Sequence, residues 1–528
     1  MAFAGLSKLV DKARVHPEEG GRVTDRWTNP DILPVLPENR TFNIKSYFGF
    51  WVAAGIAAVY WTMGSTAIAN GLSAAQAIGA MIVGAAISCG ITWGCSEFGI
   101  KYALGFPMLS RAVFGIGIQS YWGGLAMSVI LSSRPFTDSR TAFPRGEHSM
   151  FPAHITTKDF IGTMIYFVIF TALMFVKPYK LQPFFITSFI GVSLTILGMF
   201  IWAMAVNGGV GDVVAPTAAL STGETVFQFV RAVCSLATTY TGVSIRHSDW
   251  TRYSARPRDA HLAIWIACPL VVIISSTFGI LVTSAVRGIY GEIIWQPITL
   301  LAYIQDRDYS ATTRAGTFFA GVGWFLSQMG VNVSSNAVAT GMDLASIIPE
   351  FINVRRGSLI LVAIALATCP WNLVNNPGTF ITVISSLGIF ISPLIGIYIA
   401  DYTLVRYQKY KVSDLYRGDR SSIYWYQFGF HWRSFLTWIC LIWMSLPGFA
   451  AAIDGFEINV AWERIFGVSF LIGLVGGFVI YLLICTLSPV PGADIYEPWS
   501  VVVGEADHDG SPRNSLEKIT FEETSKSV

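Results

Sequence analysis

Two carboxamide side chains lie inside long apolar stretches of the 528-residue sequence. Gln119 falls in a stretch over residues 112–132, and Asn336 falls in one over residues 315–341. Each carboxamide offers two donors and an acceptor to one planar partner. A heterocycle with an amide edge, such as a nucleobase or a hydantoin ring, has the complementary pattern. The aromatic residues that could stack on the faces of such a ring are Tyr60, Trp61, Trp122 and Tyr240. Each carboxamide could instead tie two helices together.

Two opposite charges lie at the ends of apolar stretches: one ends the stretch over residues 226–247, and the other follows the stretch that holds Asn336. Arg246 is the first of these and Asp343 the second, and together they are the only plausible candidates for a buried ion pair. Unpaired charge within a membrane is costly and usually functional. We therefore expect the pair to act as a cytoplasmic gate or a proton-linked latch. The alternative is that both side chains reach interfacial water independently.

The composition is that of a membrane protein. Hydrophobic residues make up 53% of the chain and charged residues 13%, against about 25% charged residues in soluble domains. The net charge of +2 gives no indication of a nucleic-acid partner. No nucleophile–base pair or metal-ligand cluster occurs within the apolar stretches, and the seven histidines never show HExxH spacing. We expect neither an enzyme nor a bound cofactor or metal.

Apolar stretches of about 20 residues are long enough to cross a bilayer. They predict an all-α polytopic protein with twelve transmembrane helices, near residues 47–70, 73–96, 112–132, 160–176, 182–206, 226–247, 260–286, 315–341, 357–376, 379–402, 434–453 and 465–487. The excess of Lys and Arg in alternate connections predicts that both termini are cytoplasmic. Residues 1–46 would then form a cytoplasmic arm, residues 47–487 the transmembrane transporter domain, and residues 488–528 a disordered cytoplasmic tail.

Two of the predicted spans are rich in hydroxyl groups and glycine at membrane depth. Residues 238–242 read TTYTG, and the first span carries Gly55 before the run from Tyr60 to Ser65. Such segments predict broken helices at matching positions of two halves, as in transporters with inverted repeats. A helix that packs through small residues, with Thr bonding back to carbonyls, is the alternative for residues 238–242.

Several sequence strings resemble the nucleobase-cation symporters, specifically the fungal uracil, allantoin and thiamine permease branch. They run from Ile245 to Tyr253, from Ser335 to Leu344, from Cys369 to Asn372 and from Ile399 to Tyr402. The resemblance implies a LeuT-like fold of two inverted five-helix repeats plus two C-terminal helices. It also implies alternating access and proton-coupled import of a heterocycle such as uracil or allantoin at the plasma membrane. A thiamine or nucleoside permease, or a non-transporting nutrient receptor on the same fold, is the alternative.

The resemblance also assigns roles to single residues. Gln119 and Asn336 match the substrate-binding carboxamides of the family, Tyr240 matches an aromatic platform, and Asp343 matches its acidic residue in the eighth span. The stretch from Ser385 to Phe390 corresponds to an outer gating helix. The sodium-binding members carry hydroxyls where this chain has Gly330 and Val331, which favours protons as the coupled ion.

The third span departs from the family pattern. Gly115 stands where the family usually has an aromatic platform, and two strings that are normally a helical span apart are fused between Phe114 and Gln119. Either the gene model has lost a segment or the protein has a shortened third span and a compromised site. Trp122, one helical turn after Gln119, could replace the missing platform.

Overall fold

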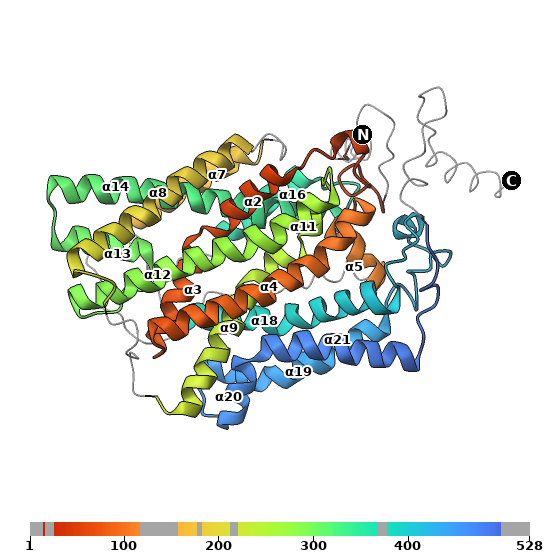
Figure 1. Cartoon of the computed structure of the whole chain (residues 1–528). Coiled ribbons are helices and arrows are strands. Elements are labelled where there is room, and N and C mark those ends of the chain that lie inside the picture. Colours follow the sequence, from red (N-terminus) through yellow and green to blue (C-terminus); the bar gives the residue numbers. More distant parts are fainter. Residues whose placement is uncertain are drawn as a thin grey trace, which may run out of the picture.

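The computed structural model describes residues 14–15, 26–116, 157–176, 182–211, 220–367 and 377–497. The described part is helical, without named strands. The long helices lie side by side, with α8, α12 and α14 on one side and α18, α19 and α21 on the other (Figure 1). Gln119 and Trp122 lie outside the described residues.

Among the described residues, helices lie at every predicted span; most of the third span, residues 117–132, lies outside the described residues. In the first half they are α2 (Ile44–Gly55), α3 (Ala58–Ala69), α4 (Ala74–Tyr102), α5 (Phe106–Phe114), α7 (Thr157–Leu173) and α8 (Gln182–Asn207). In the second half they are α9 (Thr222–Ile245), α10 (Ser248–Thr251), α11 (Pro257–Leu262), η3 (Ala263–Ala267), α12 (Cys268–Tyr290), α13 (Pro297–Arg307), α14 (Ala311–Val331), η4 (Asn332–Ala337), α15 (Val338–Ile347), α16 (Val354–Ala367) and α18 (Pro377–Ala400). The remaining elements are η1 (Pro37–Asn39), η5 (Asp401–Val405), η6 (Ser413–Tyr416), α19 (Trp432–Asp454), α20 (Val460–Gly467) and α21 (Ser469–Leu487).

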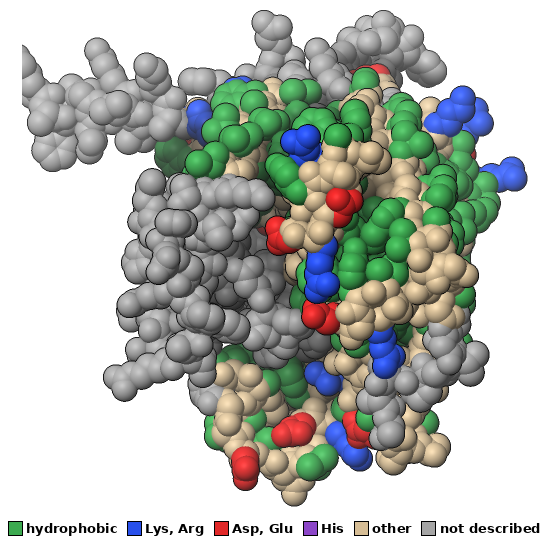
Figure 2. Space-filling view, turned by 90° about the vertical axis from the view of Figure 1, so that its left-hand side faces the viewer, with side chains coloured by type: hydrophobic (Ala, Val, Ile, Leu, Met, Phe, Trp, Pro, Cys, Tyr) green, Lys and Arg blue, Asp and Glu red, His purple; other side chains and the backbone are tan. Residues whose placement is uncertain are grey.

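Six helical segments of the described chain are long and apolar enough to cross a membrane by themselves. They are Ala74–Tyr102, Pro183–Asn207, Pro257–Tyr290, Gly388–Val405, Trp432–Ile453 and Ser469–Leu487. Figure 2 looks onto the end of the bundle at the left of Figure 1, where acidic and basic side chains are interspersed among apolar ones. Charged side chains of both signs are what an end that meets water requires.

The helix packing repeats between the two halves of the chain. The first span of the first half, α3, packs on α12, which is the second span of the second half; α9 packs in the same way on α4. The fifth spans behave alike, since α8 packs on α2 of the first span and α18 packs on α9 of the sixth. This reciprocal pattern is what two structurally equivalent five-helix units produce.

The sixth span is not broken where the sequence predicted. Helix α9 continues through residues 238–242 and ends at Ile245, so this prediction is wrong. The hydroxyls bond back to the helix itself: Thr239 Oγ1 donates to the Ser235 carbonyl at 2.8 Å, and Thr241 Oγ1 donates to the Thr238 carbonyl at 2.6 Å. Because these hydroxyls find hydrogen-bond partners within the helix, the polar segment can stay helical. This is the alternative given above for residues 238–242.

The third span begins earlier than predicted and its first helix is short. Helix α5 starts at Phe106 rather than near residue 112 and ends at Phe114, where Gly115 adopts a φ of 95°. The Phe114 carbonyl accepts a hydrogen bond from the His431 N–H at 2.9 Å, and Ile116 N–H donates to the Tyr424 carbonyl at 3.4 Å. The connection between α18 and α19 therefore occupies the place into which α5 would otherwise extend.

The two chain ends that we expected to be polar extensions are partly packed. In the arm, Asn29, Ile32 and Leu33 are buried. At the other end, Arg433 donates to the carbonyls of Ser488 and Pro489, at 2.7 and 3.0 Å. The backbone of Glu497 forms an isolated parallel β-bridge with that of Lys411. Residues 498–528 of the expected tail lie outside the described residues.

Glycines allow the backbones of α3 and α12 to approach closely. A Cβ on Gly64 would lie 2.6 Å from the Ser276 carbonyl oxygen, and a Cβ on Gly279 would lie 2.6 Å from the Trp61 carbonyl oxygen. In both cases the obstacle is backbone, which cannot rotate away. The two positions lock the first span of one half against the second span of the other.

We expect Gly279→Val to destabilise the protein by about 1–3 kcal/mol, the usual cost of overpacking, and to lower its melting temperature in detergent. Gly198→Val on α8 is the matched control, because no atom lies within 4 Å of a Cβ at that position. Equal melting temperatures for the two variants would contradict the close packing of α3 on α12.

Candidate functional site

The first span is broken at its centre, as the sequence predicted. Helix α2 ends at Gly55 and α3 begins at Ala58, with Ile56 and Ala57 in non-helical conformations between them. Ser327 Oγ on α14 donates to the Ile56 carbonyl at 2.8 Å. A broken helix inside a membrane needs such partners for its freed backbone groups. The break therefore depends on a hydroxyl from the eighth span.

Three buried rings from both halves of the chain meet beside this break. The rings of Trp51 and Tyr240 are nearly parallel, at 10° and with their centroids 5.9 Å apart. Tyr60 lies on Tyr240 with a centroid distance of 5.2 Å. The Cys268 thiol donates to the Tyr240 hydroxyl at 3.5 Å. The two centroid distances, Trp51 to Tyr240 and Tyr60 to Tyr240, fall within the range of direct ring contact, 4.5–7 Å. No third ring therefore lies between these partners in this conformation.

Several buried polar nitrogens around the rings have no hydrogen-bond partner among the described residues. They are Trp51 Nε1, Trp61 Nε1 and both ring nitrogens of His247. The ring centroids of His247 and Trp51 lie 4.6 Å apart, and Trp61 packs edge-on against Trp324 with a centroid distance of 5.7 Å. Buried polar groups are normally hydrogen-bonded. These groups are thus available to a solute or to water. Sequence analysis missed Trp51 and His247, although the position of Trp51 one turn before Gly55 was a usable signal.

Asn336 lies in the π-helical segment η4 of the eighth span. Its side chain is exposed, and its Nδ2 donates to Asn332 Oδ1 at 2.7 Å; Asn332 in turn bonds the Tyr166 hydroxyl of α7. π-Helical segments are frequent at functional sites. Among the described residues, no hydrogen bond or ring contact joins Asn336 to Tyr240 or Trp61. The convergence of all the predicted substrate residues on one solute therefore stays a prediction.

Arg246 and Asp343 form the ion pair that the sequence suggested. Arg246 Nη1 lies 3.2 Å from Asp343 Oδ2, and it also donates to Thr340 Oγ1 at 3.3 Å. The two side chains are 26% and 32% exposed. The pair joins the end of α9 to α15 and is half-buried, which leaves both groups open to exchange with water. Its role as a gate or latch remains a prediction.

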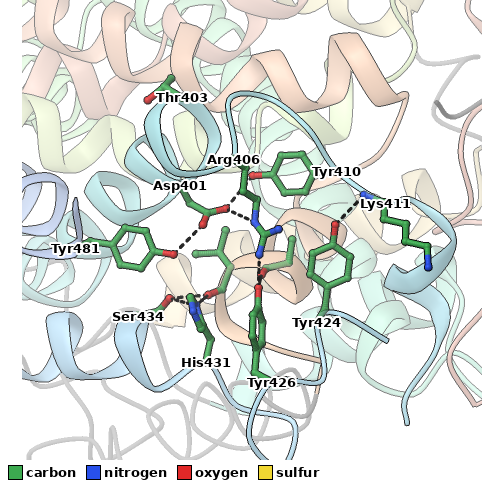
Figure 3. A network of polar contacts seen from close by, with 12 residues as sticks. Asp401, Thr403, Arg406, Tyr410, Lys411, Tyr424, Tyr426, His431, Ser434 and Tyr481 are labelled. Carbon is green, nitrogen blue, oxygen red and sulfur yellow. Dashed lines mark hydrogen bonds and ion pairs between the residues drawn. The ribbon is translucent and has the colours of Figure 1, made fainter. Parts of the chain in front are cut away.

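A second ion pair is more deeply buried, so the expectation that Arg246 and Asp343 were the only candidates is wrong. Asp401 and Arg406 are 0% exposed and lie 3.1 Å apart. Tyr410 and Tyr481 donate to the Asp401 carboxylate at 3.0 and 2.7 Å (Figure 3). Tyr481 belongs to α21, so this pair ties the end of α18 to the C-terminal helices.

The same network ends helix α5. Arg406 donates to the Tyr426 hydroxyl, which donates to the Ala112 carbonyl, each at 2.5 Å. His431 Nδ1 lies 2.8 Å from the Val113 carbonyl oxygen (Figure 3). Burial lowers the pKa of His431 to about 3. The ring is therefore neutral and able to donate one hydrogen bond to that carbonyl at any physiological pH.

The N-terminal arm covers the end of the bundle at which α9 and α15 end. Asn29 Nδ2 faces the carbonyls of Ala345, Pro349 and Ile352 at 3.1–3.4 Å. Arg252 donates to the carbonyls of Asp31 and Leu33 at 2.9 and 3.0 Å. The arm side chain of Asn29 thus binds backbone at and after the end of α15, and Arg252 binds arm backbone to the segment after α9.

A sequence model described as a permease for cytosine/purines, uracil, thiamine and allantoin matches residues 34–473. The chain belongs to this permease family. The transporter aclS of Aspergillus oryzae is 27% identical over 99% of this chain and 94% of its own length. The thiamine transporter of Saccharomyces cerevisiae is 30% identical over 87% of this chain and 79% of its own length.

Among solved structures, the chain is similar to Mhp1, a nucleobase-cation-symport-1 family transporter in a closed conformation with bromovinylhydantoin bound. The TM-score is 0.64 at 17% identity, over 90% of this chain and 98% of Mhp1. The likeness shows the fold, which is the expected LeuT-like arrangement of two inverted five-helix repeats and two C-terminal helices. This permease is a multi-pass membrane protein, and its family and structural neighbours are transporters rather than enzymes.

The permease lacks stretches that its relative aclS contains. Their alignment is 595 positions long, whereas this chain has 528 residues. In the described structure, α5 ends at Phe114, next to the fused strings at Phe114 to Gln119. Residues 117–132 lie outside the described residues, so the shortened third span stays a prediction.

For the half-buried pair we expect Asp343→Asn to change transport far more than stability. A partly exposed ion pair contributes about 1 kcal/mol at most, which corresponds to about a fivefold shift in a two-state population. Uptake should fall severalfold and lose part of its dependence on external pH, while the melting temperature stays nearly constant.

Glu224→Gln is the matched control, since Glu224 pairs with Arg464 at 3.4 Å across the opposite end of the bundle. An Asp343→Asn variant with unchanged uptake rate and unchanged pH profile would rule out the latch.

Proposed function

We propose that this permease is a secondary active transporter that imports a nucleobase or a related heterocycle, such as uracil or allantoin, together with protons. The observation that carries the proposal is the family match from residue 34 to residue 473. The broken first span supports it, because unwound backbone beside half-helix ends is how transporters of this fold hold solutes. The unpartnered polar nitrogens of Trp51, Trp61 and His247 add groups that a polar heterocycle could satisfy.

Proton coupling is favoured over sodium coupling by the side chains of the eighth span. Gly330 and Val331 offer no hydroxyl ligands where the resemblance places those of the sodium-binding members. Hard cations such as sodium prefer oxygen ligands. Carboxyl groups at the inner end of the bundle, by contrast, can take up and release a proton. We place the protein in the plasma membrane with both termini in the cytoplasm, in line with the excess of basic residues in the inner connections.

The substrate residues that we propose are Asn336, Tyr240 and Trp61, together with Gln119 and Trp122. Because Tyr240 already contacts Trp51 and Tyr60, solute binding on this ring would require the rings to separate. Asn336 has an exposed amide, and the one hydrogen bond given for its side chain among the described residues is the donation to Asn332 Oδ1. Binding at Asn336 would therefore not require the buried rings to move first.

Two alternatives have specific support. Thiamine is favoured as a substrate by the 30% identical thiamine transporter of yeast. A non-transporting nutrient receptor is the alternative that the fused strings at Phe114 to Gln119 suggest, because they depart from the family pattern at the predicted substrate residue Gln119. Signalling in response to substrate without its accumulation would identify a receptor.

The decisive experiment is an uptake panel with radiolabelled uracil, allantoin and thiamine in a host that lacks its own permeases. We expect saturable uptake of one of the three, abolished by a protonophore. Asn336→Ala should raise KM about tenfold, the loss expected from one or two hydrogen bonds of about 1 kcal/mol each. Asn70→Ala is the control; Asn70 follows the last residue of α3, and its substitution should leave KM unchanged. No uptake of any compound, with the protein present at the cell surface, would overturn the proposal.

A further inference from the structure

Asp249 is a buried carboxylate at the inner end of the bundle that no predicted role has used. It lies on α10, directly after the sixth span, and is 2% exposed. Its Oδ1 accepts a hydrogen bond from the Phe106 N–H, the first residue of α5, at 2.8 Å. Its Oδ2 is buried without a partner among the described residues. Half of this carboxyl group is therefore unsatisfied.

The packing around Asp249 leaves no room for a bulkier neighbour. A Cβ on Gly105 would lie 2.5 Å from Asp249 Oδ1 and 3.1 Å from Met342 Cε. Glycine at this position allows the start of α5 to close over the carboxyl group, with α15 on the other side. On the side of α4, the Thr251 hydroxyl donates to the Ser96 carbonyl at 3.0 Å. The site is thus built by the second, third, sixth and eighth spans together.

The charged groups that face Asp249 do not neutralise it. Asp343 on α15 acts on it with like charge, and Arg246 and Arg252 act with opposite charge. Arg246, however, is paired with Asp343. Arg252 gives both of its terminal nitrogens to arm carbonyls. From α5 comes only the backbone N–H of Phe106, and both nitrogens of the adjacent His247 are buried without partners.

An ionised carboxylate in this position is costly, because burial removes water and neither Arg246 nor Arg252 forms an ion pair with Asp249. Burial, followed by the charge of Asp343, raises the pKa of Asp249 to about 7. The group can therefore hold a proton at the pH of an acidic medium and release it at the pH of a cytoplasm once water reaches it.

We propose that the Asp249 carboxyl group binds the coupled proton while the inner face is closed, and that Asp343 is its water-accessible neighbour on the proton path. The inference rests on the proposed function and assigns the proton site within it. Protonation of Oδ2 lets α5, α10 and α15 pack around a neutral group. When the arm leaves Arg252 and the inner face opens, water solvates the carboxylate and the proton passes to the cytoplasm.

The contrast between Asp343 and Asp249 supports this division. Asp343 is about one-third exposed and ion-paired, whereas Asp249 is buried and unpaired. A group open to water exchanges protons readily, and a buried neighbour holds the proton that the exchange delivers. Ionisation of both carboxyl groups together would place two like charges close to each other, which favours opening of this face.

The test is Asp249→Asn, which keeps an acceptor for the Phe106 N–H and cannot ionise. In whole cells we expect substrate to equilibrate without accumulating, with uptake independent of external pH between 5 and 7, while exchange of internal for external substrate survives. Asp259→Asn on α11 is the matched control and should behave as the wild type. Accumulation that remains proton-driven in Asp249→Asn would overturn the inference.

A second readout does not depend on transport. Between the ordinary pKa of Asp, about 4, and the raised value near 7, the folded state holds a proton that the unfolded state releases. The melting temperature of the purified wild type should therefore fall as pH rises from about 4 to 7. That part of the slope should be absent in Asp249→Asn and present in Asp249→Glu. Identical slopes for wild type and Asp249→Asn would contradict a proton on Asp249.

The two readouts separate this inference from the proposed function. A wild type that accumulates substrate without dependence on protons would refute proton symport and, with it, the coupling role of Asp249. A wild type that takes up none of the three compounds would count against the transport proposal alone, and the melting curves would still decide whether Asp249 carries the proton. If Asp249→Asn expresses poorly, the wild type is compared with Asp249→Glu instead. The melting temperature of both should fall as pH rises, over pH ranges that differ by the difference between the pKa values of the two side chains. Identical pH ranges would contradict a proton on residue 249.

Discussion

Backbone groups that a helix leaves unpaired inside a membrane protein must find partners from other elements, and this requirement shapes the whole permease. Every helix has unsatisfied N–H groups at its start and unsatisfied carbonyls at its end. Lipid hydrocarbon provides no hydrogen-bond partners for these groups. At the central break of the first span, a serine hydroxyl of α14 meets the Ile56 carbonyl. The same demand accounts for both ends of α5 and for the path of the N-terminal arm.

Helix α5 shows how these contacts couple distant parts of the chain. At its start, the Phe106 N–H binds Asp249 of the sixth span. At its end, carbonyls of Ala112, Val113 and Phe114 accept from Tyr426, His431 and Ser434 of the connection to α19. That connection is itself held by the buried pair of Asp401 and Arg406. A movement of α5 therefore disturbs the inner charges and the C-terminal helices together.

Charge at the inner end is distributed by the same logic. The arginines do not simply pair with carboxylates: Arg252 binds arm carbonyls, and Arg246 is shared between Asp343 and Thr340. Asp249 is left with a backbone donor and an empty oxygen. In the proposed proton site, neutralising Asp249 removes the cost of burying a carboxylate without an ion-pair partner.

The sequence alone determined the membrane class, the helical architecture, the family and the break in the first span, because apolar length, composition and motif spacing are local properties. It also pointed to Arg246 and Asp343 as partners. Only the tertiary structure decided that α9 continues through residues 238–242, that α5 ends at Phe114, and that Asp401 and Arg406 form the deepest ion pair. Whether a threonine bonds back to its own helix, or a carbonyl finds a donor more than 300 residues away, depends on which elements pack together. A single local stretch of sequence does not contain that information.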